Sequence, residues 1–227
     1  MNIGNRIIQN IIRADRELVE GFRGIPSSNI NDMMNRLYCR REYMRPFNRR
    51  PLLGTAFTVK APDGDNVMLH CALDLAQPGD VIVVDGGGCV TRSLCGEIMF
   101  NYAKVCGIEG FLVDGAIRDN DSLLDMDFSV YAKGVTPQGP YKNGLGEINV
   151  PVSCGGQVVF PGDIIAGDAD GICVIRKEVA AEVLKKAQKK LAQETEILKD
   201  YHQGNLDSSS HKKTYFTILE RTDTSWE

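Results

Sequence analysis

Two short apolar runs, VIVVD at 81–85 and FLVDG at 111–115, constrain the fold most strongly. Both consist of β-branched and large apolar side chains without polar alternation, which is the pattern of a strand buried on both faces. The intervening GGGCVTRSLCGEIMFNYAKVCG has the composition of a Gly-rich turn that opens into a helix. A buried strand, a helix and a second buried strand in this order predict a parallel layer and therefore an α/β fold.

The second half of the chain has a different character. Its apolar runs are short and are divided by Gly, Pro and Asp turns: FSVYAKG, INVPVSCGG, QVVFPGD, IIAGDADG and ICVIR. Runs of this kind are typical of β-hairpins. Upstream of VIVVD, GTAFTVK is expected to form a strand and DGDNVMLHCALDLA a helix. We therefore predict hairpins packed on the first half's sheet, in a β/β/α sandwich.

Four segments are expected along the chain: an N-terminal helical cover and connector at 1–50, an α/β core at 51–176, a C-terminal helix at 177–203 and a polar tail at 204–227. The C-terminal helix has an apolar stripe and a face dense with Lys and Glu. The N-terminal segment is predicted to be helical because its apolar residues recur near the helical period: Ile7, Ile8, Ile11, Ile12 and Leu18.

Composition excludes several classes of protein. A chain of 227 residues with 43% apolar and 25% charged residues can bury a full core. The net charge of -4 is spread without a basic stripe, so no nucleic-acid partner is expected. No apolar run approaches the roughly 18 residues of a membrane span, and the N-terminus is unlike a signal peptide, so we expect a cytoplasmic protein without a membrane partner. The seven cysteines are never spaced CxxC, which argues against a zinc site and against a disulfide framework.

The candidate site follows from where the two buried strands end. Ligands of open α/β layers bind beyond the carboxyl ends of the strands, and both DGGGCVTRSLCGE and DGAIRDND begin there. The two loops should face one crevice. Glycines 86–88 would let the backbone approach a ligand, and the amides from Gly96 to Met99 would point at an anion. A plain strand-to-helix turn is equally consistent with the glycines.

The Arg118–Asp119 pair suggests the ligand. Arg118 offers a planar fork for a carboxylate, and Asp119 offers hard oxygens to Mg²⁺ or Mn²⁺. Together they could hold a 2-oxo acid chelated to a metal. Asp121 is a rival ligand, and the alternative without function is a surface Arg118 with Asp119 capping the helix DNDSLLDM.

Several motifs in this order carry a family resemblance: GTAFTV, QPGDVIVVDGGG, GEIM, GIEGFLVDGAIRD, GEINVPVSCGGQVVFPGDIIAGDADGICVI and the long C-terminal helix. Over roughly residues 50–200 the chain resembles the RraA-like family, which includes metal-dependent 4-hydroxy-4-methyl-2-oxoglutarate aldolases. The resemblance implies a β/β/α swivelling-type domain assembled as trimers or hexamers. It also implies cleavage of 4-hydroxy-2-oxo acids to pyruvate and decarboxylation of oxaloacetate, with a divalent metal as cofactor.

The resemblance also assigns roles to residues. It makes Asp119 the one protein ligand of the metal and brings Glu194 to the site from the C-terminal helix of an adjacent subunit, with Glu196 as the alternative. Glu97 stands where some of these aldolases have Asp, and either Glu97 or Glu194 would hold the water that takes the proton of the C4 hydroxyl. The pyruvate moiety would be bound by the segment Gly96, Glu97, Ile98 and Met99 together with Arg118.

Other functions remain open from the sequence. The family includes non-catalytic regulators that bind and inhibit ribonuclease E, but these generally lack the acidic residue after the Arg and the long C-terminal helix. A Schiff-base aldolase would need a desolvated lysine, for which Lys60 and Lys133 at strand ends are the candidates. His70 is expected to be structural. The group at C4 of the substrate should contact helix 66–76, the 120s loop and a neighbouring subunit, which leaves the exact 4-hydroxy-2-oxo acid open.

Overall fold

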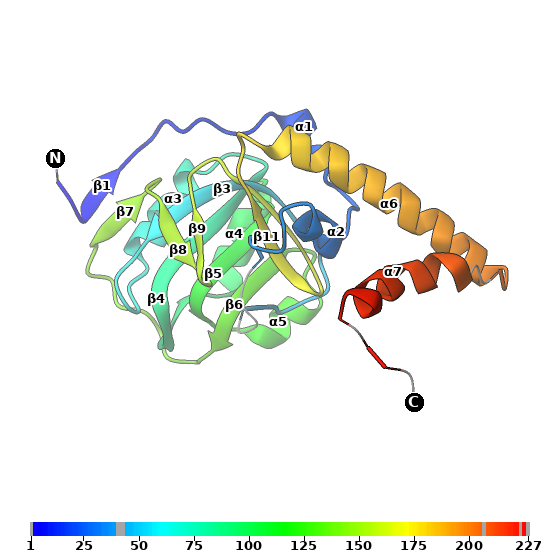
Figure 1. The fold of residues 1–227 in the computed structure, drawn as a ribbon. Coiled ribbons are helices and arrows are strands. Elements are labelled where there is room, and N and C mark those ends of the chain that lie inside the picture. Colours follow the sequence, from blue (N-terminus) through cyan, green and yellow to red (C-terminus); the bar gives the residue numbers. More distant parts are fainter. Residues whose placement is uncertain (1, 40–43, 206–207, 223, 226–227) are drawn as a thin grey trace. The chain divides into compact units, whose positions relative to one another are not determined.

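A computed structural model describes residues 2–39, 44–205, 208–222 and 224–225 (Figure 1). The chain forms two compact units, residues 1–188 and residues 189–227. The long helix α6 (Ala180–His202) begins in the first unit and ends in the second. Among the described residues, no helix has both the length and the apolar character needed to cross a membrane.

The first unit is built on a mixed sheet whose strands follow the order β1-β7-β3-β4-β5-β6-β2, with the β10–β11 hairpin paired to β3. The four central strands, β3 to β6, are parallel to one another. The bounds of the strands are β1 Asn5–Ile7, β2 Arg45–Pro46, β3 Leu52–Lys60, β4 Asp80–Cys95, β5 Gly110–Ile117, β6 Ser129–Val135, β7 Gly146–Ile148, β10 Ile164–Asp168 and β11 Gly171–Ile175.

The two faces of this sheet are covered differently. Helices α3 (Val67–Leu75), α4 (Glu97–Val105) and α5 (Asn120–Leu124) cover one face, and a separate hairpin of β8 (Val152–Cys154) and β9 (Gln157–Val159) covers the other with β10–β11. The side chains of β4 alternate accordingly, because Ile82 and Val84 pack under the helices while Val81 and Val83 pack under the β layer. The predicted β/β/α sandwich is confirmed.

The prediction of a helical N-terminal cover is wrong for the first residues. Residues 5–7 form β1, which pairs in parallel with β7, and helix in this segment is confined among the described residues to α1 (Arg16–Glu20) and α2 (Ser27–Asp32). The Ile8 amide donates to the Ile148 carbonyl at 3.1 Å, and Asn149 Nδ2 donates to the Ile8 carbonyl at 2.8 Å. Pairing with the sheet edge therefore overrides the helical spacing of the isoleucines.

The prediction of a Gly-rich turn after VIVVD is also wrong. Strand β4 continues through the glycines to Cys95, with a shift in its register to β5 between Asp85 and Cys89. Gly87 and Gly88 have φ values of 64° and 70°, which glycine adopts without steric cost, so they absorb a bulge without ending the strand. The helix expected after this segment does form, as α4.

The second unit contains the end of α6 and helix α7 (Ser208–Arg221). The C-terminal helix was predicted at 177–203, and α6 occupies nearly that range. The segment after it was predicted as a polar tail, and the structure shows that this segment contains helix α7. In α7, the rings of His211 and Tyr215 lie one turn apart with centroids separated by 5.7 Å, a spacing at which side chains support a helix.

Candidate active site

The candidate site begins where β4 and β5 end side by side. Cys95 and Ile117 are paired in register, and the Arg118 amide donates to the Cys95 carbonyl at 3.0 Å. Gly96, which precedes α4, therefore lies against the Arg118–Asp119 pair that precedes α5. The structure brings together the two segments that the order of motifs predicted would face one crevice.

The carboxylate of Asp119 is held at the start of α4. Its Oδ2 accepts a hydrogen bond from the Glu97 amide at 3.0 Å and lies 3.5 Å from Arg118 Nε. The side chain of Asp119 makes no capping hydrogen bond to α5. The alternative in which Asp119 only caps this helix is therefore wrong. The backbone of Asp119 is left-handed, with φ 60° and ψ 41°, which is uncommon for a residue other than glycine and concentrates at functional positions.

Gly96 makes this arrangement possible through its lack of a side chain. A Cβ there would lie 2.8 Å from Arg118 Cγ and closer still to Asp119 Oδ2. Its φ of -159° is extended and open to any residue, so space rather than backbone conformation requires the glycine. Gly96 therefore lets the charged pair approach the positive end of α4.

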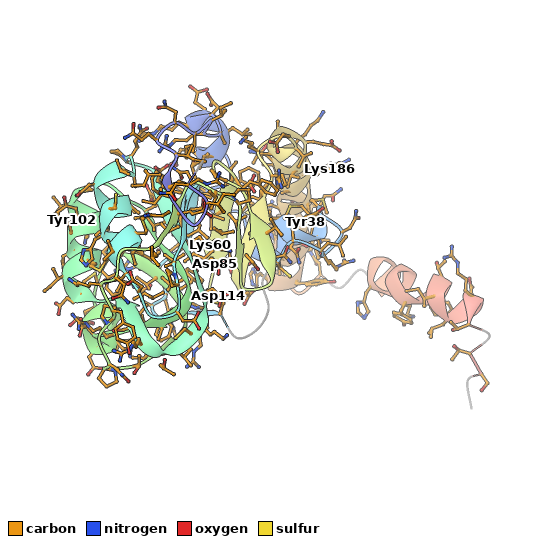
Figure 2. The ribbon with its side chains drawn as sticks, turned by 90° about the vertical axis from the view of Figure 1, so that its left-hand side faces the viewer. Tyr38, Lys60, Asp85, Tyr102, Asp114 and Lys186 are labelled. Atoms are coloured by element: carbon orange, nitrogen blue, oxygen red, sulfur yellow. The ribbon has the colours of Figure 1, made fainter. Side chains whose placement is uncertain are left out.

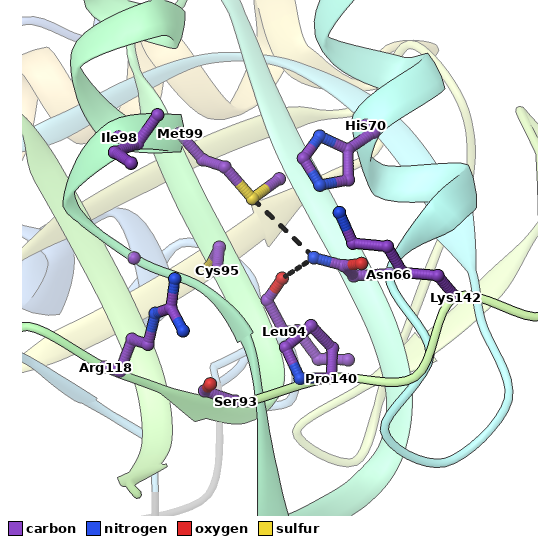
Figure 3. Close-up of a pocket in the computed structure, with 11 residues that line it drawn as sticks. Asn66, His70, Ser93, Leu94, Cys95, Ile98, Met99, Arg118, Pro140 and Lys142 are labelled. Carbon is purple, nitrogen blue, oxygen red and sulfur yellow. Dashed lines mark hydrogen bonds between the residues drawn. The ribbon is translucent and has the colours of Figure 1, made fainter. Parts of the chain in front are cut away.

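A cavity of about 270 Å³ opens beside this pair. Of the residues expected to bind substrate, Gly96, Ile98, Met99 and Arg118 line it. Figure 3 shows Arg118 on one side of the cavity and His70 and Lys142 on the other. The cavity therefore has cationic side chains at two separate places.

Glu97 lies at the start of α4 but does not line the cavity. Its Oε2 accepts a hydrogen bond from Ser122 Oγ at 2.9 Å, which ties the carboxylate to α5. Glu97 was expected to bind substrate. In the structure its backbone amide donates a hydrogen bond to Asp119, and its side chain is exposed.

Asn66 is a site residue that the sequence reasoning missed. It is 3% exposed, and its Nδ2 donates to the Leu94 carbonyl at 2.9 Å and contacts Met99 Sδ at 3.8 Å (Figure 3). Because a carbonyl can only accept, this bond sets the orientation of the amide. Oδ1 of Asn66 is buried and has no hydrogen-bond partner among the described residues, so this residue at the cavity wall has an acceptor that the fold does not satisfy.

His70 and Lys142 were also missed, His70 because a structural role was expected. Partial burial lowers the pKa of His70 below its usual value, and the positive charge of Lys142 lowers it further while Asp74 opposes the change, so the site favours the neutral imidazole. Asn66 and His70 are four residues apart, and both come from the 66–76 segment that was expected to contact the C4 group. Lys142 lies in a loop without a local sequence signal.

The remaining expected residues lie elsewhere. Asp121 is exposed in the first turn of α5 and does not line the cavity. Glu194 pairs with Lys190 at 3.0 Å, and Glu196 lies 3.8 Å from Lys199, all within the second unit. The role of Glu194 or Glu196 at a neighbour's site stays a prediction.

Glycines 86–88 do not line the cavity. They lie at a row of charged residues on the face covered by the β8–β9 hairpin, where Lys60 Nζ is 3.4 Å from Asp85 Oδ2. Asp114, which is paired with Asp85, accepts a hydrogen bond from the Gly155 amide at 2.8 Å. Figure 2 shows Lys60, Asp85 and Asp114 in this row.

The donor set at Asp119 fits a cation that keeps most of its water. Across the described ranges, no group of three or more His, Cys, Asp or Glu side chains is placed to hold a metal ion. Mg²⁺ commonly binds through one or two carboxylates plus waters and substrate oxygens, so a single Asp is a sufficient protein ligand. Oδ1 of Asp119 accepts no hydrogen bond from the described residues, and the side chain is 39% exposed.

Fold and site together define an α/β protein with a pocket, lined by Arg118 and Lys142, at the carboxyl ends of its parallel strands. A family model described as "RraA-like: Aldolase/RraA" matches residues 27–174. The chain belongs to the RraA-like family. This agrees with the resemblance inferred from its motifs.

Three relatives illustrate the family. A Halalkalibacterium halodurans protein named "Putative 4-hydroxy-4-methyl-2-oxoglutarate aldolase" is 42% identical over 181 residues, which are 79% of this chain and 86% of that protein. The structure of Streptomyces coelicolor RraAS2, described as an unusual member of the RNase ES inhibitor RraA family, is similar with a TM-score of 0.73 and 26% identity over 82% of this chain and 98% of that one. The RNA-processing inhibitor RraA from Thermus thermophilis has a TM-score of 0.61 and 28% identity over 66% and 91% of the two chains.

Proposed function

We propose that this protein is a divalent-metal-dependent lyase of the class II aldolase type. It would cleave a 4-hydroxy-2-oxo acid, such as 4-hydroxy-4-methyl-2-oxoglutarate, to pyruvate and a second carbonyl compound, and would also decarboxylate oxaloacetate. The observation that carries the proposal is the Arg118–Asp119 pair held over Gly96 at the start of α4, beside a cavity of about 270 Å³. The name of the Halalkalibacterium relative supports the same reaction.

Arg118 would bind the C1 carboxylate of the substrate. Within the described part of the chain, its two terminal nitrogens make no hydrogen bond, so both are available for a bidentate contact. The Ile98 amide is likewise unpaired among the described residues and belongs to the first turn of α4, where the helix dipole favours an anion. These groups would orient the 2-oxo acid with its keto oxygen toward Asp119.

Asp119 would hold the metal, Mg²⁺ or Mn²⁺. A bound divalent cation supplies positive charge beside the 2-keto oxygen, where the electron pair of the broken C3–C4 bond must settle as an enolate. The hydrogen bond from the Glu97 amide and the nearby Arg118 orient the carboxylate before substrate arrives. The positive charge of Arg118 further favours the negatively charged product of bond cleavage.

Asn66 and an acidic residue would manage the proton of the C4 hydroxyl. Oδ1 of Asn66, which has no hydrogen-bond partner among the described residues, would accept a hydrogen bond from that hydroxyl and set its direction. A water held by Glu97 or by Glu194 of a neighbouring subunit would take the proton as the C3–C4 bond breaks. Decarboxylation of oxaloacetate reaches the same enolate without this base.

Lys142 indicates the substrate class. It lines the cavity with Arg118, and the two cations come from separate loops. A substrate with a carboxylate at each end would meet one cation at each, whereas a monocarboxylate would leave Lys142 without a partner. We therefore favour dicarboxylic 4-hydroxy-2-oxo acids, with the neutral His70 as a further hydrogen-bonding group beside the second carboxylate.

The test is a pyruvate-release assay on oxaloacetate and on 4-hydroxy-4-methyl-2-oxoglutarate, with and without EDTA. We expect release on both substrates, loss of release with EDTA and recovery on addition of excess Mg²⁺ or Mn²⁺. Release that persists unchanged in EDTA would contradict the role of Asp119. Absence of release with either metal would contradict the lyase itself.

A second candidate is a non-catalytic regulator that binds and inhibits ribonuclease E. The structural likeness to the two RraA proteins favours it, since both are described as inhibitors of RNA processing or of an RNase. This function predicts a stable complex with purified ribonuclease E and no turnover of 2-oxo acids. Turnover without complex formation would reject it.

We further propose a homo-oligomer, a trimer or a hexamer, whose sites each use Glu194 from a neighbour. The proposal rests on the family resemblance and on the apolar stripe of α6, where Ala180, Val183 and Ala187 are buried and no described residue of the helix after Ala187 is buried. Subunits carrying Asp119→Ala and subunits carrying Glu194→Ala should each be inactive alone. Mixed oligomers, verified by mass, should regain activity, because some sites then contain both native residues.

A further inference from the structure

Cys39 and Cys173 face each other across an isolated antiparallel bridge. The Val174 amide donates to the Tyr38 carbonyl at 3.0 Å, so the hydrogen bonds flank the cysteine pair and the pair itself is of the non-hydrogen-bonded type. In such pairs the facing Cα atoms are about 4.5 Å apart and the side chains are close, a separation that a disulfide can span. Tyr38, which precedes Cys39, is labelled in Figure 2.

The main chain of each cysteine is anchored by hydrogen bonds to neighbouring segments. Cys173 lies in β11, paired with Ala166 of β10. The Cys39 carbonyl accepts a hydrogen bond from Gln157 Nε2 at 2.9 Å, and the same nitrogen donates to the Leu37 carbonyl at 3.0 Å. The two cysteines are therefore held opposite each other, and a disulfide between them would require no movement of the main chain.

The two thiols have different environments. Cys39 is exposed, whereas Cys173 is 1% exposed and its Sγ donates to the Ser27 carbonyl at 3.2 Å. Burial raises the pKa of the Cys173 thiol to about 12, so this thiol stays protonated at neutral pH. Cys39 is thus the thiol that a reagent in solvent can reach, whereas Cys173 is shielded from solvent.

The remaining cysteines have no such arrangement. Three of them lie in paired strands, and each faces a residue that is not cysteine: Cys89 faces Gly115, Cys95 faces Ile117 and Cys154 faces Gln157. Cys71 lies within α3 and Cys106 lies at the end of α4, and both helices cover the other face of the sheet. Proximity therefore favours one pair among the seven.

We propose that Cys39 and Cys173 are a redox modification site. A low-molecular-weight disulfide of the glutathione type would oxidise the two thiols to an intramolecular disulfide. The Cys39 thiolate attacks one sulfur of the reagent, forms a mixed disulfide and expels one thiolate. Cys173 then loses its proton to solvent and attacks Cys39 Sγ, and the second thiol leaves. Two protein thiols are oxidised, and one small disulfide is reduced to two thiols.

The disulfide would change the stability of the first unit. It would replace the hydrogen bond from Cys173 to Ser27, the first residue of α2, and would tie the chain that follows α2 to β11. Because it closes a very long loop, it restricts the unfolded chain, and we expect Tm to rise by roughly 5 °C on oxidation. The proposal does not depend on the proposed lyase activity.

The test uses the full chain, reduced, freed of reductant and incubated with oxidised glutathione at mildly alkaline pH. After free thiols are blocked with N-ethylmaleimide, unreduced proteolytic peptides are analysed by mass spectrometry. We expect a peptide pair joined through Cys39 and Cys173 and a rise in Tm that dithiothreitol reverses. Cys106→Ser, which leaves the pair intact, should give the same result.

Two variants complete the experiment. Cys39→Ser changes an exposed side chain and should abolish both the linked peptide and the rise in Tm. Cys173→Ser, if it folds, should stop the reaction at a stable glutathione adduct on Cys39. The proposal is overturned if the wild-type chain also stops at that adduct, if neither thiol reacts, or if Cys39 is joined to another cysteine.

Discussion

The two faces of the sheet at the ends of β4 and β5 carry charged residues that are covered by different elements. On the helix face, Arg118 and Asn66 line a cavity, and the terminal nitrogens of Arg118 and Oδ1 of Asn66 have no hydrogen-bond partner among the described residues. On the hairpin face, Oδ2 of Asp85 and Oδ2 of Asp114 accept hydrogen bonds from the amides of β8 and of the turn that follows it, while Oδ1 of Asp114 is buried without a hydrogen-bond partner among the described residues. Charge alone therefore does not distinguish a binding site from a structural cluster.

The difference lies in what covers the strand ends. The β8–β9 hairpin presents backbone amides, which are donors, to the carboxylates beneath it. Helix α4 presents its positive end to Asp119 and leaves space beyond it. We expect substitutions on the helix face to reduce activity and matched substitutions on the hairpin face to reduce stability.

The largest effect is expected from Asp119→Ala. Removing the proposed metal ligand should lower kcat/KM by roughly 10³-fold or more, because metal stabilisation of an enolate is worth several kcal/mol. Circular dichroism should show an unchanged fold, and excess Mn²⁺ should not restore the rate. Near-wild-type activity with metal stimulation would place the ligand elsewhere.

The matched substitution on the hairpin face is Asp114→Ala. Asp114 is 9% exposed, and its loss leaves the Gly155 amide without its acceptor, so we expect unfolding free energy to fall by about 1–3 kcal/mol with activity retained. Urea unfolding measures the first effect and the pyruvate assay the second. A selective loss of kcat in Asp114→Ala would erase the distinction between the two faces.

Arg118→Lys should have the next largest effect. The substitution keeps the charge but loses the planar fork, so we expect a raised KM, a lowered kcat and a loss in kcat/KM of roughly 10- to 100-fold. Steady-state kinetics on oxaloacetate separates the two parameters. An unchanged KM would mean that the carboxylate is bound by another group.

Two glycines offer a comparison based on space. Gly96→Ala places a methyl group against Arg118 and Asp119, and we expect activity to fall by about 10-fold or more through displacement of the pair. Gly88→Ala meets the flexible end of Lys133 at a φ of 70°, so it should cost about 1 kcal/mol of stability and leave activity largely intact. Equal losses of activity in both variants would contradict the assignment of Gly96.

Lys142→Met is expected to act on substrate choice. If Lys142 binds the second carboxylate, KM for a dicarboxylic substrate should rise about 10-fold, which corresponds to loss of one charge-assisted hydrogen bond. A 4-hydroxy-2-oxo acid with a single carboxylate should be affected little. A similar rise in KM for both substrates would mean that Lys142 attracts anions in general and does not bind the second carboxylate.

The smallest effect concerns His70. Its pKa is lowered from 6.5, first by burial and then by Lys142, so Lys142→Met should raise it again, as an NMR titration of the imidazole would show. Below pH 6.5 the unfolded chain binds this proton more readily than the native chain. The contribution of His70 to the free energy of unfolding is therefore lost as pH falls from 6.5 toward the native pKa. Lys142→Met should lose less of this free energy than the wild type over the same pH range.

Much of the fold was predictable because its signals are local. The apolar runs VIVVD and FLVDG, the turns of the second half and the stripe of the C-terminal helix each indicate an element without reference to distant residues. The errors occur where a distant partner decides. The first isoleucines form an edge strand because β7 offers unpaired backbone groups, and β4 passes through three glycines because β5 continues beside it.

The candidate site divides in the same way. Residue chemistry and order along the chain were enough to select Arg118, Asp119 and the turn at Gly96, since strand ends and helix starts are properties of short segments. Only the tertiary structure brought Asn66, His70 and Lys142 to the same cavity, because these residues approach Arg118 through packing of α3 and a loop against the sheet. It also decided which charged residues are covered, because the amides that donate to Asp85 and Asp114 come from a hairpin far along the chain.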